Sequence, residues 1–145
     1  IRCGYIAARE DWIDKLADLK IATSFGGARL AASILALALT DGSYRKHMET
    51  VRRRLGEART TTATRLARLG IEPWLRPGAG MFLWCRLPGE TDAAELARRC
   101  LDDGVVLAPG NAFSLSQTAR SFMRFNVAQS ADERVFRSLE AALHH

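Results

Sequence analysis

Few residues in this sequence of 145 are placed to do covalent or metal chemistry. The clearest candidate for another kind of chemistry is an arginine, Arg124. We find no zinc-ligand spacing, no phosphate-binding glycine loop and no Ser-His-Asp pattern. Residues 122–128 alternate as a strand does, with Met123, Phe125 and Val127 on one face. Arg124 then lies on the opposite face, where it can enter a cleft while the apolar side chains fill the core. A guanidinium binds a carboxylate or a phosphate through two directed hydrogen bonds, so anion binding is the chemistry indicated.

Two arginines are candidates for this role, and the residue pattern leaves a simpler interpretation open for each. By itself, the alternation around Arg124 favours a buried or edge ion pair. Arg2 precedes a short apolar stretch, and a surface charge at the end of a strand explains it as well. The residues alone therefore identify these two side chains without assigning a ligand to either.

The composition is that of an ordinary globular protein able to bury one core. Hydrophobic residues make up 48% of the chain and charged residues 26%. The most apolar stretch, Ala28 to Thr40, is too short for a membrane span. Three well-separated cysteines, Cys3, Cys85 and Cys100, indicate neither a disulfide framework nor a thiolate metal site, and we expect a cytoplasmic protein.

The chain is basic, with a net charge of +5 and a pI near 9.6. Much of this charge lies between Arg45 and Arg68. One interpretation is a helix with a basic, solvated face, and the alternative is a nucleic-acid-binding module that contacts phosphates through this helix. The basic residues are spread around the helix and not gathered on one edge, which favours the solvated face.

Periodicity near the start predicts one strand and two helices. Residues 1–8 alternate weakly and suit a short buried strand. Residues 10–20 and 28–40 show helical spacing. The second of these segments is apolar almost all round, which predicts that it is enclosed on most sides. The pair Asp41-Gly42 marks a natural boundary, because glycine readily takes the left-handed conformation that ends a helix.

A long helix is predicted after this boundary. Apolar residues recur at steps of four and three from Tyr44 to Leu69, and Gly70 is placed to end the helix. The same spacing occurs in coiled coils, but Gly56 and Thr62 interrupt it. A long connecting helix that lies on a sheet is the favoured interpretation.

The rest of the chain predicts a small sheet with two further helices. Strands are expected at residues 80–87, 105–107 and 122–128. Thr91 is expected to cap the helix between the first two strands, and residues 130–133 to form the capping box of the final helix. The predicted fold class is α+β, a small antiparallel-type sheet with helices on one side.

Several segments, in this order and spacing, resemble the fold-type I pyridoxal-phosphate (PLP) aminotransferases of class I/II. The similar segments are residues 1–6, residues 77–84, residues 104–113 and Met123-Arg124-Phe125-Asn126. The resemblance covers essentially the whole chain and implies the C-terminal portion of that fold. Residues 1–42 would be a remnant of the PLP-binding large domain, and residues 43–145 would be the small domain.

Residues 122–136 are most similar to the aminotransferase-like domain of MocR regulators, a branch of the GntR transcriptional regulators. That resemblance implies a parent protein with a separate winged-helix domain that binds DNA. A free-standing amino-acid aminotransferase is the alternative parent. The resemblance also implies an amino acid or 2-oxo acid as ligand, and nothing in the sequence suggests a membrane partner. The apolar helix of residues 28–40 would normally pack against the rest of the large domain. Large exposed apolar patches favour association, so we expect a homo-oligomer such as a dimer.

The same resemblance implies a role for each arginine. Arg2 would bind the PLP phosphate, and Arg124 would bind the α-carboxylate of the substrate. The family also needs a lysine that forms a Schiff base with PLP, just before the position of Arg2. The chain's lysines, Lys15, Lys20 and Lys46, all follow it. We therefore expect no catalytic residue in this chain, no PLP bound by it and no transaminase activity from it alone.

Overall fold

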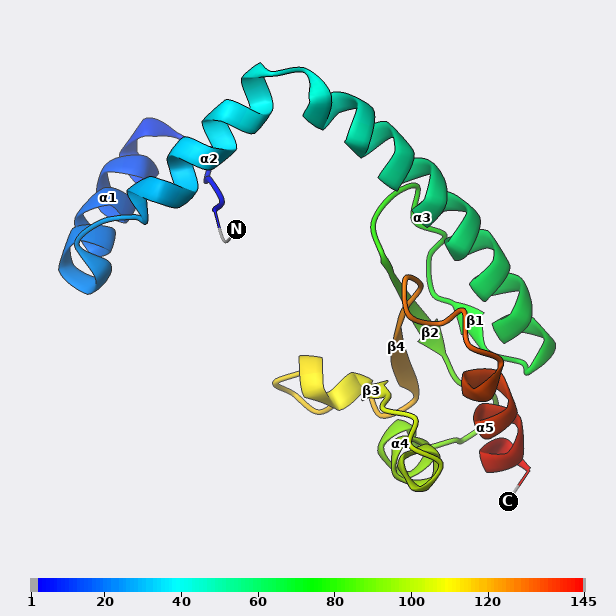
Figure 1. Ribbon diagram of the computed structural model, residues 1–145. Coiled ribbons are helices and arrows are strands. Elements are labelled where there is room, and N and C mark those ends of the chain that lie inside the picture. The colour runs from blue at the N-terminus through cyan, green and yellow to red at the C-terminus, as the bar shows by residue number, and fades with distance from the viewer. Residues whose placement is uncertain (1–2, 145) are drawn as a thin grey trace. The chain divides into compact units, whose positions relative to one another are not determined.

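A computed structural model describes residues 3–144, which fall into two compact units, Ile1–Glu49 and Thr50–His145. Each unit is considered by itself. The described elements are, in chain order, α1 (Glu10–Ser24), α2 (Arg29–Thr40), α3 (Ser43–Arg68), β1 (Glu72–Pro73), β2 (Phe82–Arg86), α4 (Ala93–Asp102), β3 (Ala108–Pro109), the 3-10 helix η1 (Gly110–Phe113), β4 (Phe122–Asn126) and α5 (Glu133–Leu143) (Figure 1). The division between the units falls within α3.

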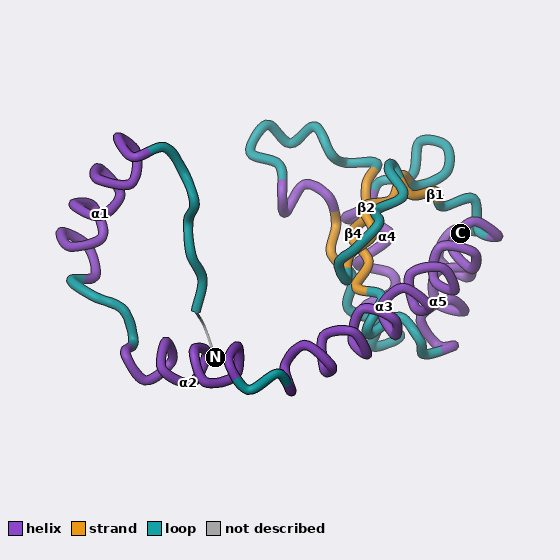
Figure 2. The backbone as a smooth tube through the Cα atoms, turned by 90° about the horizontal axis from the view of Figure 1, so that it is seen from above, coloured by secondary structure: helices purple, strands orange, loops and turns teal. Residues whose placement is uncertain are grey.

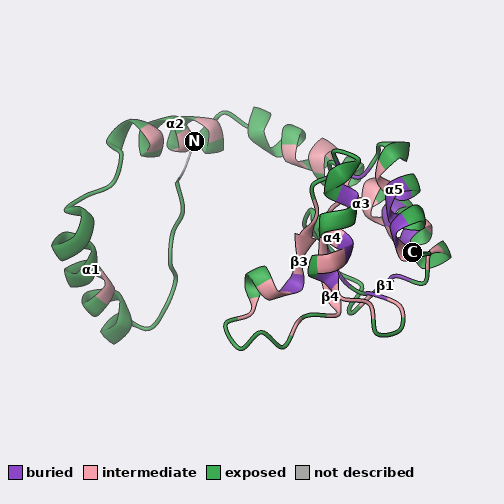
Figure 3. Cartoon of the chain, turned by 90° about the horizontal axis from the view of Figure 1, so that it is seen from below, coloured by how far each residue is buried: buried purple, intermediate pink, exposed green. Residues whose placement is uncertain are grey.

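The first unit has helices but buries almost nothing. Neither α1 nor α2 contains a buried residue (Figure 3). The exposure of residues 28–40 agrees with the expectation that this apolar helix needs the rest of a large domain to enclose it. Alanine and leucine favour a helix through local backbone hydrogen bonds, but enclosure needs a packing partner, and the described part of this unit supplies none.

The strand predicted at residues 1–8 is also absent, as far as the structure describes that segment. Residues 3–9 are exposed and have no regular secondary structure. A strand requires a neighbouring strand to pair with its backbone groups, and no strand is described in this unit.

The second unit contains an antiparallel sheet with the strand order β1-β2-β4-β3. Figure 2 labels three of these strands, β1, β2 and β4. Strands β2 and β4 form its centre, with Leu83 opposite Phe125 and Trp84 opposite Arg124. The outer strands are only two residues long each. The central pair therefore fixes which side chains share a face of the sheet.

One face of this sheet is covered by helices and forms the core. Leu83 and Cys85 of β2 and Met123 and Phe125 of β4 are almost fully buried. The helices contribute further buried residues to the same core, namely Leu66 from α3, Leu96 and Cys100 from α4, and Phe136, Leu139 and Ala142 from α5. The predicted α+β class, with helices on one side, is confirmed.

The strand predicted at residues 105–107 is displaced toward the C-terminus. The backbone N–H of Val105 donates to the carbonyl of Cys100 at 2.9 Å, so Val105 still belongs to the turn that ends α4. Pairing with β4 starts only at Ala108, which lies opposite Arg124. Hydrophobic character at 105–107 therefore reflects packing of Val105 and not membership of the sheet.

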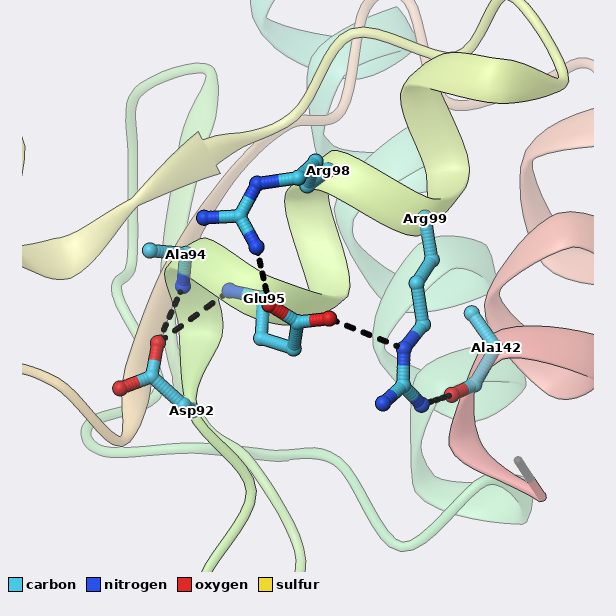
Figure 4. Close-up of polar contacts among 6 residues, drawn as sticks. All are labelled: Asp92, Ala94, Glu95, Arg98, Arg99 and Ala142. Atoms are coloured by element: carbon cyan, nitrogen blue, oxygen red, sulfur yellow. Dashed lines mark hydrogen bonds and ion pairs between the residues drawn. The ribbon is translucent and has the colours of Figure 1, made fainter.

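Both helix caps were predicted at the wrong residue. Asp92, and not Thr91, caps α4, with its carboxylate accepting from the backbone N–H groups of Ala94 and Glu95 (Figure 4). Asp132, and not Ser130, caps α5. The hydroxyls of Thr91 and Ser130 instead donate to carbonyls of the preceding turns, at 2.7 and 2.8 Å.

A single arginine links the two helices that lie next to each other on the core. The Glu95 carboxylate pairs with Arg98 and Arg99, and Arg99 also donates to the carbonyl of Ala142 at 3.1 Å (Figure 4). The last carbonyls of a helix have no hydrogen-bond partner within that helix. The bond from Arg99 of α4 therefore satisfies the carbonyl of Ala142 near the C-terminal end of α5.

Replacing Asp92 by alanine is expected to lower the free energy of unfolding by about 1 kcal/mol, the usual effect of losing a helix N-cap. The amides of Glu95 and Ala94 hold the pKa of Asp92 below its ordinary value of 3.8. The stabilisation is therefore complete above pH 3.8 and is lost as the pH falls through the lower folded pKa. Urea denaturation at pH 7 and at acid pH measures both effects.

The control, Asp102→Ala at the other end of α4, is expected to be neutral or slightly stabilising, because an acid is unfavourable at a helix C-terminus. Equal losses in the two variants would contradict the capping role.

Candidate functional site

The sheet face away from the helices carries a row of aromatic side chains. Trp84 is stacked on Phe122, with ring centroids 5.5 Å apart, and meets Phe113 edge-on at 6.1 Å. Trp74 contacts Phe122 edge-on at 5.4 Å. These rings come from β2, β4, η1 and the segment after β1, so the fold gathers residues that are far apart in the sequence.

Arg124 lies within this aromatic row. Its Cζ atom is 4.4 Å from the ring centroid of Phe82 and 3.9 Å from that of Phe113. The side chain is half-buried, on the face of β4 opposite Met123 and Phe125, as the alternation predicts. Among the described residues, no acidic side chain forms an ion pair with it, and no hydrogen bond of its guanidinium is observed. The ion pair that the pattern alone favours is therefore not present in this part of the chain.

A hollow of about 310 Å³ opens beside Arg124. Its walls are mixed: apolar side chains come from Phe82, Phe125, Val135 and the segment Val105 to Ala108, and Arg124, Asn126, Gln129 and Ser130 make the rest polar. Asn126 and Gln129 supply amide groups at the rim, and they are hydrogen-bonded to each other at 3.1 Å. A hollow of this size that joins apolar walls to one cation and a few amide and hydroxyl groups can hold a small molecule.

A tightly packed loop holds Phe113 next to Arg124. Gly110 begins η1 and is buried, and a Cβ atom there would lie 2.3 Å from the carbonyl oxygen of Ala119. Asn111 accepts from the backbone N–H of Ala119 at 3.0 Å. The Gln117 side chain donates to the Asn111 carbonyl at 3.2 Å. From the sequence, this loop is a plain turn, and only the glycine at its start signals the close backbone approach.

Two arginines from the basic segment of α3 make contacts within the second unit. Arg59 donates to the carbonyls of Gly78 and Gly80, at 2.9 and 3.0 Å. Arg65 lies over the ring of Phe136, 3.7 Å from its centroid, and pairs with Glu133. These contacts attach the helix to its neighbours, which supports a structural role for these two arginines over nucleic-acid binding.

A second hollow, of about 510 Å³, lies between α3 and the segment after β1. Arg59 and Arg76 line it, but Arg124 does not. We see no group of three or more His, Cys, Asp or Glu residues able to hold a metal within residues 3–144. No described helix is long and apolar enough to cross a membrane.

The other residues considered from the sequence are not brought into this site. Arg2 lies outside the described residues. Lys15 and Lys20 belong to α1 and Lys46 to the start of α3, so every lysine is in the first unit. Residues 50–145 therefore provide arginines but no amine side chain to the face that carries Arg124.

Residues 1–141 match the model of the aminotransferase class I and II family, and the chain belongs to that family. Its relatives include both regulators and enzymes. The HTH-type transcriptional regulator YdfD of Bacillus subtilis is 26% identical over 135 residues, which are 92% of this chain and 28% of the regulator. Aromatic-amino-acid aminotransferase 1 of Thermococcus litoralis is 26% identical over 138 residues, covering 92% of this chain and 33% of the enzyme.

Solved aminotransferase structures have the same fold. The α-aminoadipate aminotransferase LysN of Thermus thermophilus, solved with N-(5'-phosphopyridoxyl)-L-leucine, superimposes with a TM-score of 0.79 at 26% identity. The match covers 94% of this chain and 36% of LysN. The chain thus spans 36% or less of each of these three relatives.

Family membership implies PLP in the whole protein. PLP is held covalently by a lysine amine in enzymes of this kind. The unit that contains Arg124 has no lysine, so it does not by itself fit the cofactor. What this unit can offer is recognition of an anionic group next to a partly apolar hollow.

Proposed function

We propose that this chain is the C-terminal part of an aminotransferase-like effector domain in a MocR-type transcriptional regulator, and that it binds the α-carboxylate of an amino acid through Arg124. Residues 1–42 would belong to the large PLP-binding domain and residues 43–145 to the small domain. Arg2 would bind the PLP phosphate. The observation that carries the proposal is a half-buried guanidinium that lies over two aromatic rings and has no acidic partner among the described residues.

The surroundings of Arg124 favour a carboxylate over other ligands. A charge next to aromatic rings and a partly apolar hollow has lost part of its hydration, so an anion with matching geometry binds it more strongly than in open water. The planar fork of arginine pairs with both oxygens of a carboxylate. A ligand such as an amino acid has this group at one end and an apolar or polar side chain at the other.

The chemistry of PLP, when it is bound in the whole protein, is to act as an electron sink for the bound amino acid. The residues described here would bind and orient the carboxylate and exclude water from the face of the sheet. They supply no group for proton transfer at the substrate, so we expect residues 50–145 to have no transaminase activity.

A regulator and a free-standing aminotransferase make different predictions for the whole protein. In favour of the regulator, the relatives at 26% identity include YdfD, which is named as an HTH-type transcriptional regulator. In favour of the enzyme, they also include an aminotransferase at the same identity. The protein in its full encoded length should bind duplex DNA with an affinity that changes when an amino acid is added. Transfer of amino groups without any DNA binding would favour the enzyme.

Binding of a carboxylate tests the proposed ligand chemistry directly. We choose 4-methylpentanoate, which has the carbon skeleton of leucine without its amino group, so that binding is not complicated by reaction with PLP. Isothermal titration calorimetry of the full-length protein should show binding of 4-methylpentanoate and at least about tenfold weaker binding of the neutral 4-methylpentanamide, because the amide forms no ion pair. Equal affinity for the acid and the amide would contradict the proposal.

A further inference from the structure

We infer that Phe82 and Phe113 are positioning residues, which hold the faces of the Arg124 guanidinium so that its edge is presented to a ligand carboxylate. The inference rests on the carboxylate-binding role proposed above for Arg124. It adds that recognition depends on an aromatic clamp built from two separate elements, β2 and η1.

The geometry of the guanidinium explains why rings and ligand do not compete. A guanidinium is planar, and its N–H bonds point outward in that plane, whereas an aromatic ring attracts a cation lying over its face. The Cζ atom of Arg124 lies over both the Phe82 and the Phe113 rings, at 4.4 and 3.9 Å from their centroids. Rings that cover the faces of the guanidinium leave its in-plane donors for a carboxylate.

Ordering the arginine in advance should strengthen binding. A free arginine side chain has many rotamers and loses most of them when it grips a ligand. If the rings have already restricted those rotamers, the ligand does not have to supply that entropy. Among the described residues, no hydrogen bond or ion pair holds the Arg124 guanidinium in place.

The rings are themselves supported. The edge-on contact of Trp84 with Phe113 and the stacking of Trp84 on Phe122 connect the clamp to the centre of the sheet. Trp84 also lies directly opposite Arg124 in the strand register. Phe113 is the last residue of η1, which begins at the buried Gly110. The clamp is thus part of the folded framework and does not depend on the ligand.

Leucine and tyrosine substitutions separate the effect of the ring from that of apolar volume. Phe82→Leu and Phe113→Leu keep an apolar side chain but remove the ring, whereas Phe82→Tyr and Phe113→Tyr keep the ring. Each leucine variant of the full-length protein should bind 4-methylpentanoate roughly 3- to 10-fold more weakly, and each tyrosine variant should stay within about 2-fold of the wild type. Because Phe82 and Phe113 are 43% and 48% exposed, the core should stay intact in all four.

Trp74→Leu is the matched control, because Trp74 belongs to the same aromatic row but contacts Phe122 and not Arg124. It should leave the affinity unchanged. Binding of 4-methylpentanamide should be the same in every variant, whereas general damage to the face would weaken acid and amide alike. Wild-type affinity in both leucine variants, or an equal loss in the tyrosine variants, would overturn the inference.

A ligand-free measurement keeps the inference separate from the proposed function. In a ¹H–¹⁵N spectrum, ring currents from Phe82 and Phe113 should move the Arg124 Nε–H resonance upfield, and either leucine variant should move it back. If this resonance is unaffected by both, the clamp does not exist, whatever the protein binds. If the clamp is seen but an Arg124→Gln variant binds 4-methylpentanoate normally, the proposed function fails and the positioning role falls with it.

Discussion

Replacing Arg124 by glutamine is expected to weaken the binding of 4-methylpentanoate by about 100- to 1,000-fold, because two charge-assisted hydrogen bonds are lost together. Glutamine keeps a polar side chain on the same face of β4 but carries no charge. Lysine keeps the charge but not the planar fork, so Arg124→Lys should lie between the two, about tenfold weaker than the wild type. Calorimetry on the full-length protein measures both.

Arg86→Gln provides the matched control for this prediction. Arg86 lies on β2, on the same face of the sheet as Trp84, and is exposed. The same charge is removed, but at a site that contacts neither Phe82 nor Phe113 in the observed clamp. The control should bind with nearly wild-type affinity. A similar loss in both variants would mean that only the overall positive charge of this face matters.

Replacing Gly110 by alanine is expected to have the largest effect on stability. The added Cβ would lie 2.3 Å from the carbonyl oxygen of Ala119 and 2.8 Å from that of Phe122. Both are backbone atoms, so neither can turn aside as a flexible side chain would. We expect the free energy of unfolding to fall by about 3 kcal/mol, at the upper end of the usual cost of overpacking. Urea denaturation measures the loss.

Gly56→Ala tests whether this cost is specific. Gly56 lies within α3, and a Cβ there would meet nothing within 4 Å. The same substitution should therefore stabilise the protein by about 0.5–1 kcal/mol, because alanine favours a helix and restricts the unfolded chain. Opposite signs at the two glycines are the expected result. A neutral Gly110→Ala variant would show that η1 is not held against β4 as described.

Local patterns in the sequence predict the central elements of the second unit well. Alternation around Arg124 identifies both the strand and its inward face, because side chains in a strand point to opposite sides in turn. Gly70, with a φ of 72°, follows the end of the long helix as predicted. In each case the signal lies within a few residues of the feature that it predicts.

The errors arise where neighbouring residues compete or where distant ones must meet. Thr91 and Asp92 can both cap a helix. In the structure the Asp92 carboxylate accepts from the first amides of α4, whereas the Thr91 hydroxyl donates to the Pro88 carbonyl. No pattern in the sequence predicts the aromatic clamp. Phe82 and Phe113 are far from Arg124 in the sequence, and no periodicity connects them, so their contact follows from the pairing of β2 with β4 and the path of η1.

In the first unit, too, the sequence predicts the helices but not what packs against them. Helical spacing gives α1 and α2 correctly, because a helix is made from neighbouring backbone groups. Whether an apolar helix is covered depends on what lies beside it. That information is not contained in the helix itself, so the sequence predicts that residues 28–40 need a covering surface without showing which residues supply it.

A crystal structure of the full-length protein with 4-methylpentanoate bound tests the central claim most directly. We predict that both carboxylate oxygens lie within about 2.7–2.9 Å of guanidinium nitrogens of Arg124, in the paired geometry of an arginine–carboxylate bridge. The rings of Phe82 and Phe113 should still cover the faces of the guanidinium. A carboxylate bound in the hollow lined by Arg59 and Arg76, or an Arg124 paired with an acidic side chain of the protein, would contradict the account.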